Sequence, residues 1–263
     1  MQQPTVTTTL KRYLTFPFQG AGWTGRFVTG SALVLASYFV PFVPMLFAYG
    51  YTLRIMQQTM RARELSLPAW TDWGKLGVDG VRVTVISLAY VLPGLVVLLG
   101  GWLLQVAIVF LWPALTAANP NRGSATDLLL ALAGVTSGIA VVTLSTLLGL
   151  VLIIAGLVVL PTATAHFVAR DQVAAAFRVR EWWPLLRKNK TGYLSAWVIA
   201  LGLASAIGIA LNLGYYTIVL CCLTPFMSAP LYFYVMVDSA ALFGETYRDS
   251  TDLMNSAQLP PAG

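Results

Sequence analysis

The chain has 263 residues, of which 57% are hydrophobic and only 10% are charged, with a formal net charge of +6. A soluble domain carries about 25% charged residues, so this composition excludes an ordinary soluble protein. The apolar residues gather in uncharged runs longer than the roughly 20 residues that cross a bilayer. Lipid admits only helices or closed barrels, and the alternating pattern of a barrel is absent. We therefore predict an all-α fold, a polytopic transmembrane helix bundle with about five membrane segments.

We expect one membrane domain over residues 1–263. Its expected parts are a cytoplasmic amino-terminal segment (1–26), a membrane bundle (27–247) and a flexible polar tail (248–263). The first residues lack the basic-then-apolar order and the small-residue cleavage site of a removable signal peptide. The apolar segments are therefore expected to be permanent membrane anchors.

The first apolar run, residues 27–53, contains Pro41 and Pro44. Each proline removes a backbone donor and clashes with the carbonyl four residues earlier, so the run should break into two half-helices. Basic residues flank both sides of the run, which favours a re-entrant or broken hairpin with both ends in the cytoplasm. The alternative is a single kinked span with an outside amino terminus, since proline is common in membrane helices.

Basic residues predict the orientation of the later spans. Lys and Arg are frequent in residues 54–82 and 170–190, whereas the connection 113–127 contains a single arginine. Cytoplasmic loops carry an excess of Lys and Arg, so both basic segments should face inward and the connection outward, in the cytoplasmic membrane. In the first of these segments, Trp70 and Trp73 are expected on one helical face at the level of the lipid headgroups.

This orientation determines how often each later run crosses the membrane. As a helix, residues 128–169 would be about 63 Å long, twice the thickness of the hydrocarbon core. The run joins an outward connection to an inward segment, so we expect one long tilted span. Residues 191–237 should form two spans, with Asn212 and Gly214 supplying the turn.

A row of small residues marks the fourth span. Ala196, Ala200, Ala204 and Gly208 recur every four residues. Small side chains in this register allow two helix backbones to approach closely in a membrane. We predict that the row is a helix-packing face, with another helix of the same chain as its partner and an external subunit as the alternative.

The second inward segment combines cations with indole rings. Its residues of interest are Arg178, Arg180, Arg187, Lys188, Lys190, Trp182 and Trp183. Indoles favour the headgroup boundary, and basic residues gain ~1 kcal/mol each near anionic lipid. We predict contacts with anionic lipids of the inner leaflet; the alternative is that the charges only fix topology. Pro184 should divide the segment into two helices, because the residue before a proline disfavours helical geometry.

Few residues carry the chemistry that an enzyme needs. His166 is the only histidine, and we interpret it as a polar residue at the inner interface and not as a proton carrier. Asp238 is expected near the inner headgroups. The adjacent Cys221 and Cys222 lack zinc-site spacing, and nucleotide-binding and hydrolase motifs are absent. We therefore expect no enzyme activity, no cofactor and no metal site.

Short motifs follow one another along most of the chain. They are GYTLR (50–54), LPAW with DW (67–73), DG (79–80), YVLPG (90–94), AAFRVREWWPLLRKNKTGYLSAW (175–197) and the closing PF, FY and LFGETY elements (225–247). In this order, over roughly residues 23–247, the sequence resembles the prokaryotic domain-of-unknown-function family 4013, small integral membrane proteins of bacteria and archaea. The resemblance implies an architecture and no activity, so no catalytic residues follow from it.

Two classes of function remain open. The first is a non-catalytic membrane protein that scaffolds, assembles or regulates a complex or a lipid region. Its partners would be membrane lipids and other membrane subunits, with no nucleic acid. The second is a small permease or lipid-handling transporter, because broken helices bind substrates in transporters. A polar cavity beside Pro41 would favour the transporter, and contact between Asp238 and His166 would favour an intramembrane enzyme.

Overall fold

The computed structural model describes residues 6–61, 65–117, 125–215 and 218–256. Regular structure in these residues is helical, and they contain no strand. Contacts group the chain into two compact units: unit 1 comprises residues 1–86 and 161–263, and unit 2 comprises residues 87–160. The prediction of an all-α fold is confirmed.

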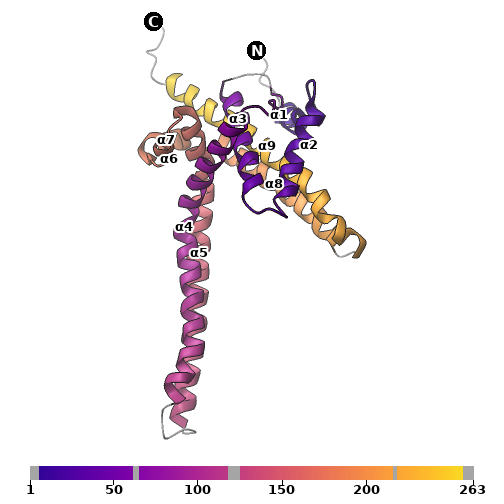
Figure 1. The fold of residues 1–263 in the computed structure, drawn as a ribbon. Coiled ribbons are helices and arrows are strands. Elements are labelled where there is room, and N and C mark those ends of the chain that lie inside the picture. Colours follow the sequence, from indigo (N-terminus) through magenta and orange to yellow (C-terminus); the bar gives the residue numbers. More distant parts are fainter. Residues whose placement is uncertain (1–5, 62–64, 118–124, 216–217, 257–263) are drawn as a thin grey trace. The chain divides into compact units, whose positions relative to one another are not determined.

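The helices follow one another along the chain with mostly short connections (Figure 1). Their bounds are α1 Val6–Thr15, the 3-10 helix η1 Phe16–Phe18, α2 Trp23–Ala36, α3 Val43–Met60, α4 Trp73–Ala117, α5 Ala125–Arg170, α6 Val173–Ala176, α7 Val179–Lys188, α8 Lys190–Tyr215 and α9 Ile218–Ser256. Among the described residues, 4 helices, α4, α5, α8 and α9, are long and apolar enough to cross a membrane. The predicted polytopic membrane protein therefore has four such helices where about five segments were expected.

The later helices agree with the predicted crossings and differ in detail. Residues 128–169 lie within the single helix α5, which continues through Pro161. The predicted pair of helices is present as α8 and α9, but the chain does not turn at Asn212 or Gly214, since both lie inside α8. At the other end, α9 continues to Ser256. Residues 248–256 are therefore helical and not part of a flexible tail.

The first apolar run is broken, as predicted, and the break contains Pro41 but not Pro44. The helix α2 has 14 residues and already ends at Ala36, before either proline. Pro41 lies in the connection, and Pro44 lies in the first turn of α3. Proline is favoured in a first turn because its missing N–H has no partner there in any helix. Pro44 thus begins a helix, and the prediction that it breaks one is wrong.

The connection between α2 and α3 presents large apolar side chains. Phe39 is 74% exposed and Phe42 is 80% exposed, and Tyr38 and Val40 are exposed as well. Phe42 has a φ of 71°, a left-handed conformation that bulky residues rarely adopt. Exposed aromatic and aliphatic side chains at a tight turn suit a hydrocarbon environment. The re-entrant placement of this hairpin stays a prediction.

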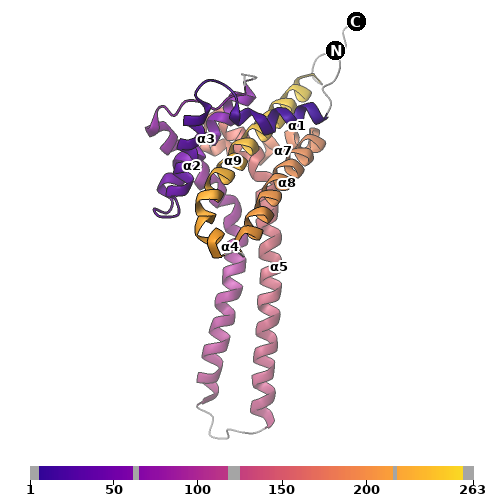
Figure 2. The ribbon, with the colours of Figure 1, turned by 90° about the vertical axis from the view of Figure 1, so that its right-hand side faces the viewer.

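The core of unit 1 forms around α9, which packs against α2, α3, α7 and α8 (Figures 1 and 2). An aromatic cluster fills the contact with α3: Tyr51 stacks on Trp70 with ring centroids 3.9 Å apart, and Phe233 of α9 lies beside both rings. The Trp70 indole N–H also donates to the backbone carbonyl of Arg26 at 2.8 Å. Trp70 precedes α4, so the predicted helical face shared with Trp73 is wrong; the two indoles nevertheless stack, with centroids 5.5 Å apart.

The helices α3 and α4 meet at two glycines. A Cβ placed on Gly50 would lie 2.0 Å from the carbonyl oxygen of Leu76, and one placed on Gly80 would lie 1.9 Å from the carbonyl oxygen of Leu46. Each glycine therefore faces the backbone of the other helix. Close backbone approach of this kind is the usual role of small residues where membrane helices pack.

Unit 2 is a helical hairpin made by the second part of α4 and the first part of α5 (Figure 2). Small residues again allow close approach: a Cβ on Gly156 would lie 2.3 Å from the carbonyl oxygen of Tyr90, and one on Gly101 would lie 1.7 Å from the Ser145 hydroxyl. The outward side chains are mostly exposed leucine, valine and isoleucine. Such a surface is stable in lipid, where exposed apolar side chains carry no hydration cost.

Candidate functional site

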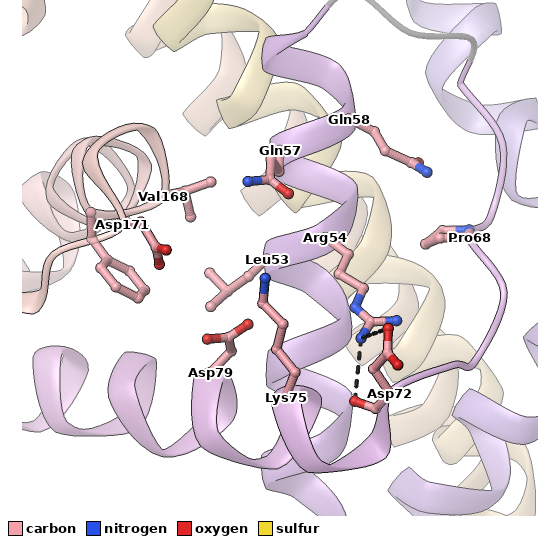
Figure 3. A pocket seen from close by; sticks show the side chains of 11 residues that line it. Leu53, Arg54, Gln57, Gln58, Pro68, Asp72, Lys75, Asp79, Val168 and Asp171 are labelled. Carbon is pink, nitrogen blue, oxygen red and sulfur yellow. Dashed lines mark hydrogen bonds and ion pairs between the residues drawn. The ribbon is translucent and has the colours of Figure 1, made fainter.

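A polar cavity of about 230 Å³ lies within unit 1 (Figure 3). Its polar lining side chains are Arg54, Gln57 and Gln58 of α3, Asp72, Lys75 and Asp79 at the start of α4, and Asp171 just after α5. The three α3 residues have spacings of three and four, which places them on one helical face. Lys75 and Asp79 are four apart and project from α4 in the same way.

One ion pair joins α3 to the residues that begin α4. The Arg54 guanidinium lies 3.9 Å from the Asp72 carboxylate and also donates to the Asp72 backbone carbonyl at 3.3 Å (Figure 3). It donates to the Thr71 hydroxyl at the same distance. Asp72 itself is highly exposed, so the ion pair alone contributes little stability. The several contacts of Arg54 instead fix how the chain enters α4.

A second cluster of charges joins α4 to the end of α5. The Arg82 guanidinium lies 3.3 Å from the Asp79 carboxylate and 3.7 Å from the Asp171 carboxylate. Asp171 has a φ of 51° and Asp72 a φ of 52°. Aspartate is one of the few residues other than glycine that adopt this left-handed conformation readily. The two residues therefore turn the backbone sharply where α5 ends and α4 begins.

The cavity offers charged and hydrogen-bonding side chains. Its lining contains no histidine or cysteine, and no group of three metal-ligating side chains occurs in the described part of the chain. Lys75 makes no hydrogen bond or ion pair with another described side chain. The arrangement can bind a small polar or charged group.

His166 takes part in a buried hydrogen-bonded chain. Its Nδ1 lies 2.8 Å from the Tyr247 hydroxyl, and its Nε2 lies 3.1 Å from the Glu181 carboxylate. The hydrogen bond to His166, followed by the charge of Arg178, lowers the pKa of Glu181 below its ordinary value. An ionised Glu181 only accepts, so Nε2 carries the donated proton, and in the neutral imidazole Nδ1 accepts from Tyr247. His166 thus connects α5, α7 and α9.

Asp238 is fully buried in unit 1, and its expected position near the inner headgroups stays a prediction. Both of its carboxylate oxygens lack a hydrogen-bond partner among the described residues. The partners of His166 are Tyr247 and Glu181, so the contact between Asp238 and His166 that would favour an intramembrane enzyme is not formed.

The residues predicted to contact lipid differ in their exposure in the structure. Arg178, Arg180, Arg187, Lys188 and Lys190 are all exposed. Trp183 is 42% exposed, whereas Trp182 is buried and donates its indole N–H to the Ala176 carbonyl at 2.9 Å. Trp182 is therefore a core residue, and its assignment as a lipid contact is wrong. Pro184 lies inside α7 and does not divide it.

The predicted packing face is also divided. Ala196 and Ala200 are buried, whereas Ala204 and Gly208 are exposed. A Cβ on Gly208 would meet no atom within 4 Å. The first half of the row packs inside the chain as predicted, and the second half faces away from the described residues of unit 1.

Sequence reasoning missed the residues that surround the polar cavity. Arg54 and Asp72 are 18 positions apart, and no local spacing indicates that they meet. The LPAW and DW motifs lie in the connection that brings Asp72 to Arg54. These motifs were the sequence signal that could have indicated the site. The burial of Asp238 was not predicted, because its short distance from the end of the apolar run suggested exposure.

Comparison with known families assigns the chain to one of them. The family described as "Protein of unknown function (DUF4013)" matches residues 32–216, which is more than half of the chain. No curated protein and no solved structure matches the sequence. The resemblance expected from the ordered motifs is confirmed. With its long apolar helices and its glycine-mediated helix crossings, the chain belongs to the DUF4013 family of proteins of unknown function.

Proposed function

We propose that this membrane protein is a non-catalytic scaffold, assembly or regulatory component of the cytoplasmic membrane, and that α7 contacts anionic lipids of the inner leaflet. The observation that carries the proposal is the two-sided character of α7. Trp182 and Leu185 are buried, while Trp183 and the basic residues are exposed. The buried pair attaches α7 to unit 1, and the other face is free to meet a membrane surface.

The exposed face of α7 combines apolar and basic side chains. Val179, four residues before Trp183, is 47% exposed, and Phe177, just before α7, is 46% exposed. Arg180 and Arg187 are three residues before and four residues after Trp183, so they share its side of the helix. An interfacial helix of this composition inserts its apolar side chains among the headgroups and directs its cations to anionic lipid.

Two observations support a non-catalytic role. The polar cavity of unit 1 has an ion pair between its walls, and its lining contains no histidine or cysteine. The histidine is held between Tyr247 and Glu181 in a satisfied structural arrangement. A catalytic group needs a free path to a substrate atom, and the burial of His166 opposes one.

The lipid-handling alternative has one observation in its favour. A groove of about 330 Å³ lies between α2 and α9, and Phe27, Leu35, Phe226 and Pro230 are among its lining residues. The groove is beside the broken hairpin but is mostly apolar, so it suits an acyl chain and not a polar solute. The polar cavity that would favour a permease lies at the far end of α3 from Pro41.

The proposal is tested with purified full-length protein in nanodiscs of mixed neutral and anionic lipid. Changing Arg180, Arg187 and Lys188 together to Gln should lower the retention of anionic lipid, and added salt should lower it further. The matched control exchanges the same residues with conserved charge, as Arg180→Lys, Arg187→Lys and Lys188→Arg, and should retain the lipid. Equal anionic-lipid retention by the Gln variant and the wild type would remove α7 from the proposal.

A further inference from the structure

Three arginines that are distant in sequence meet at one cavity of unit 1. Arg61 follows the end of α3, Arg170 ends α5, and Arg248 lies in the last part of α9. All three line a cavity of about 380 Å³ that is separate from the exposed face of α7. None of its lining residues is acidic. Three cations facing one space without a lining carboxylate form an unusual surface in a chain with so few charges.

Of the three guanidiniums, only Arg248 forms an ion pair within the described part of the chain, and the charge of Arg170 acts at longer range to help lower the pKa of Glu181. Arg248 lies 3.0 Å from the Glu245 carboxylate and 3.4 Å from that of Asp249, and it donates to the Thr59 carbonyl at 3.2 Å. These contacts hold Arg248 in place. The side chains of Arg61 and Arg170 make no hydrogen bond or ion pair with any described residue, so their donors remain available.

The rest of the cavity adds neutral polar groups and an apolar wall. Gln57 offers an amide donor, and Thr251, whose hydroxyl donates to the Arg248 carbonyl at 2.6 Å, offers only acceptor lone pairs. Met60 and Val168 are apolar. Tyr247 also lines the space, and its buried hydroxyl is held by His166 at 2.8 Å. The histidine chain therefore acts as support for one wall. The lining as a whole suits an anion that carries a hydrocarbon group.

We propose that this cavity is a binding site for a phosphate group. Each guanidinium offers planar paired donors that match the oxygens of phosphate, and charge-assisted hydrogen bonds of this type are the strong ones. Both free arginines lie in segments that basic residues place at the cytoplasmic face. A phosphate there comes either from an anionic lipid headgroup or from a soluble phosphate compound, and both present the same oxygens.

A simpler interpretation is that Arg61 and Arg170 only complement the negative ends of α3 and α5. Cations in the last turn of a helix are stabilising by 0.3–1 kcal/mol, and they would serve this purpose wherever they pointed. This interpretation does not explain why Arg61 and Arg170 line the same cavity as Arg248. The two interpretations differ in what the loss of both charges does to ligand binding.

The test uses the full-length protein in neutral-lipid nanodiscs doped with phosphatidic acid, with bound lipid counted by native mass spectrometry. Arg61→Gln with Arg170→Gln should lower phosphatidic acid binding at least about tenfold, the loss expected for one or more charge-assisted hydrogen bonds. Arg61→Lys with Arg170→Lys keeps the charge but loses the paired donors, so intermediate binding is expected. The matched control is Lys11→Gln with Arg12→Gln, which removes two exposed cations of α1 outside both proposed sites, and its bound phosphatidic acid should be unchanged.

Inorganic phosphate distinguishes the two sources. Stabilisation of the wild type by inorganic phosphate in neutral nanodiscs, absent in the double Gln variant, would identify a soluble phosphate ligand. Retention of phosphatidic acid without any response to inorganic phosphate would identify a lipid headgroup. If both the double Gln and the double Lys variants keep a folded circular dichroism spectrum and bind both probes as the wild type does, the site is refuted. That result would leave the proposal for α7 intact.

Discussion

Replacing Gly80 with alanine should force α3 and α4 apart. The new Cβ would lie 1.9 Å from the carbonyl oxygen of Leu46, where ordinary contact begins at 3.4 Å. The atom that it meets belongs to a helix backbone and not to a flexible side chain, so a rotamer change cannot relieve the overlap. Gly50 has the same relation to Leu76, at 2.0 Å. Relief therefore requires movement of a whole helix.

The expected cost follows from two opposing effects. Overpacking a close contact costs typically 1–3 kcal/mol, and a backbone obstacle places Gly80→Ala at about 3 kcal/mol. Alanine regains up to about 1 kcal/mol through its better helix propensity. The expected net loss in the free energy of unfolding is about 2 kcal/mol. Gly74→Ala in the same helix meets no atom within 4 Å, so it should lose nothing and gain up to about 1 kcal/mol.

The assay is denaturation of the purified protein by SDS in mixed micelles, followed by tryptophan fluorescence. The two alanine variants should differ by about 3 kcal/mol, with Gly74→Ala the more stable. Gly50→Ala combined with Gly80→Ala should cost less than the sum of the single changes, because one alanine already separates the helices. Equal stabilities of Gly74→Ala and Gly80→Ala would refute the close crossing of α3 and α4.

Two further predictions concern α8 and α7. Ala200→Leu should lower the free energy of unfolding by about 1–3 kcal/mol, since Ala200 is buried. The same change at the exposed Ala204 should be nearly neutral. A larger loss for Ala204→Leu than for Ala200→Leu in the SDS assay would contradict the packing of α8. Hydrogen bonding to His166 lowers the pKa of Glu181 below 4.5, so its stabilising contribution is present above pH 4.5 and is lost as the pH falls through the lowered pKa. Thermal unfolding of Glu181→Gln should show less loss of stability over that acidic range than the wild type, and identical pH profiles would oppose this role.

Much of the architecture followed from local properties of the chain. The long apolar runs predicted α4, α5, α8 and α9, because a hydrocarbon environment requires each backbone polar group to be bonded within its own helix. The break near Pro41 was also predictable from local sequence, because proline removes a backbone donor. The helix α2 nevertheless ends before both prolines. Motif order was enough to indicate the family. Each of these signals depends on residues close together in sequence.

The candidate sites depended on contacts between distant parts of the chain. Sequence analysis assigned Trp182 and Trp183 to the same lipid contact, and the packing of α7 on α9 determined that Trp182 is buried. The convergence of Arg61, Arg170 and Arg248 on one cavity arises in the same way. A residue's position along a helix defines its angle around the axis, whereas the rotation and crossing of the packed helices define what lies opposite. That rotation results from side-chain and glycine contacts between segments more than 100 residues apart, such as α3 and α9, and no local pattern encodes it.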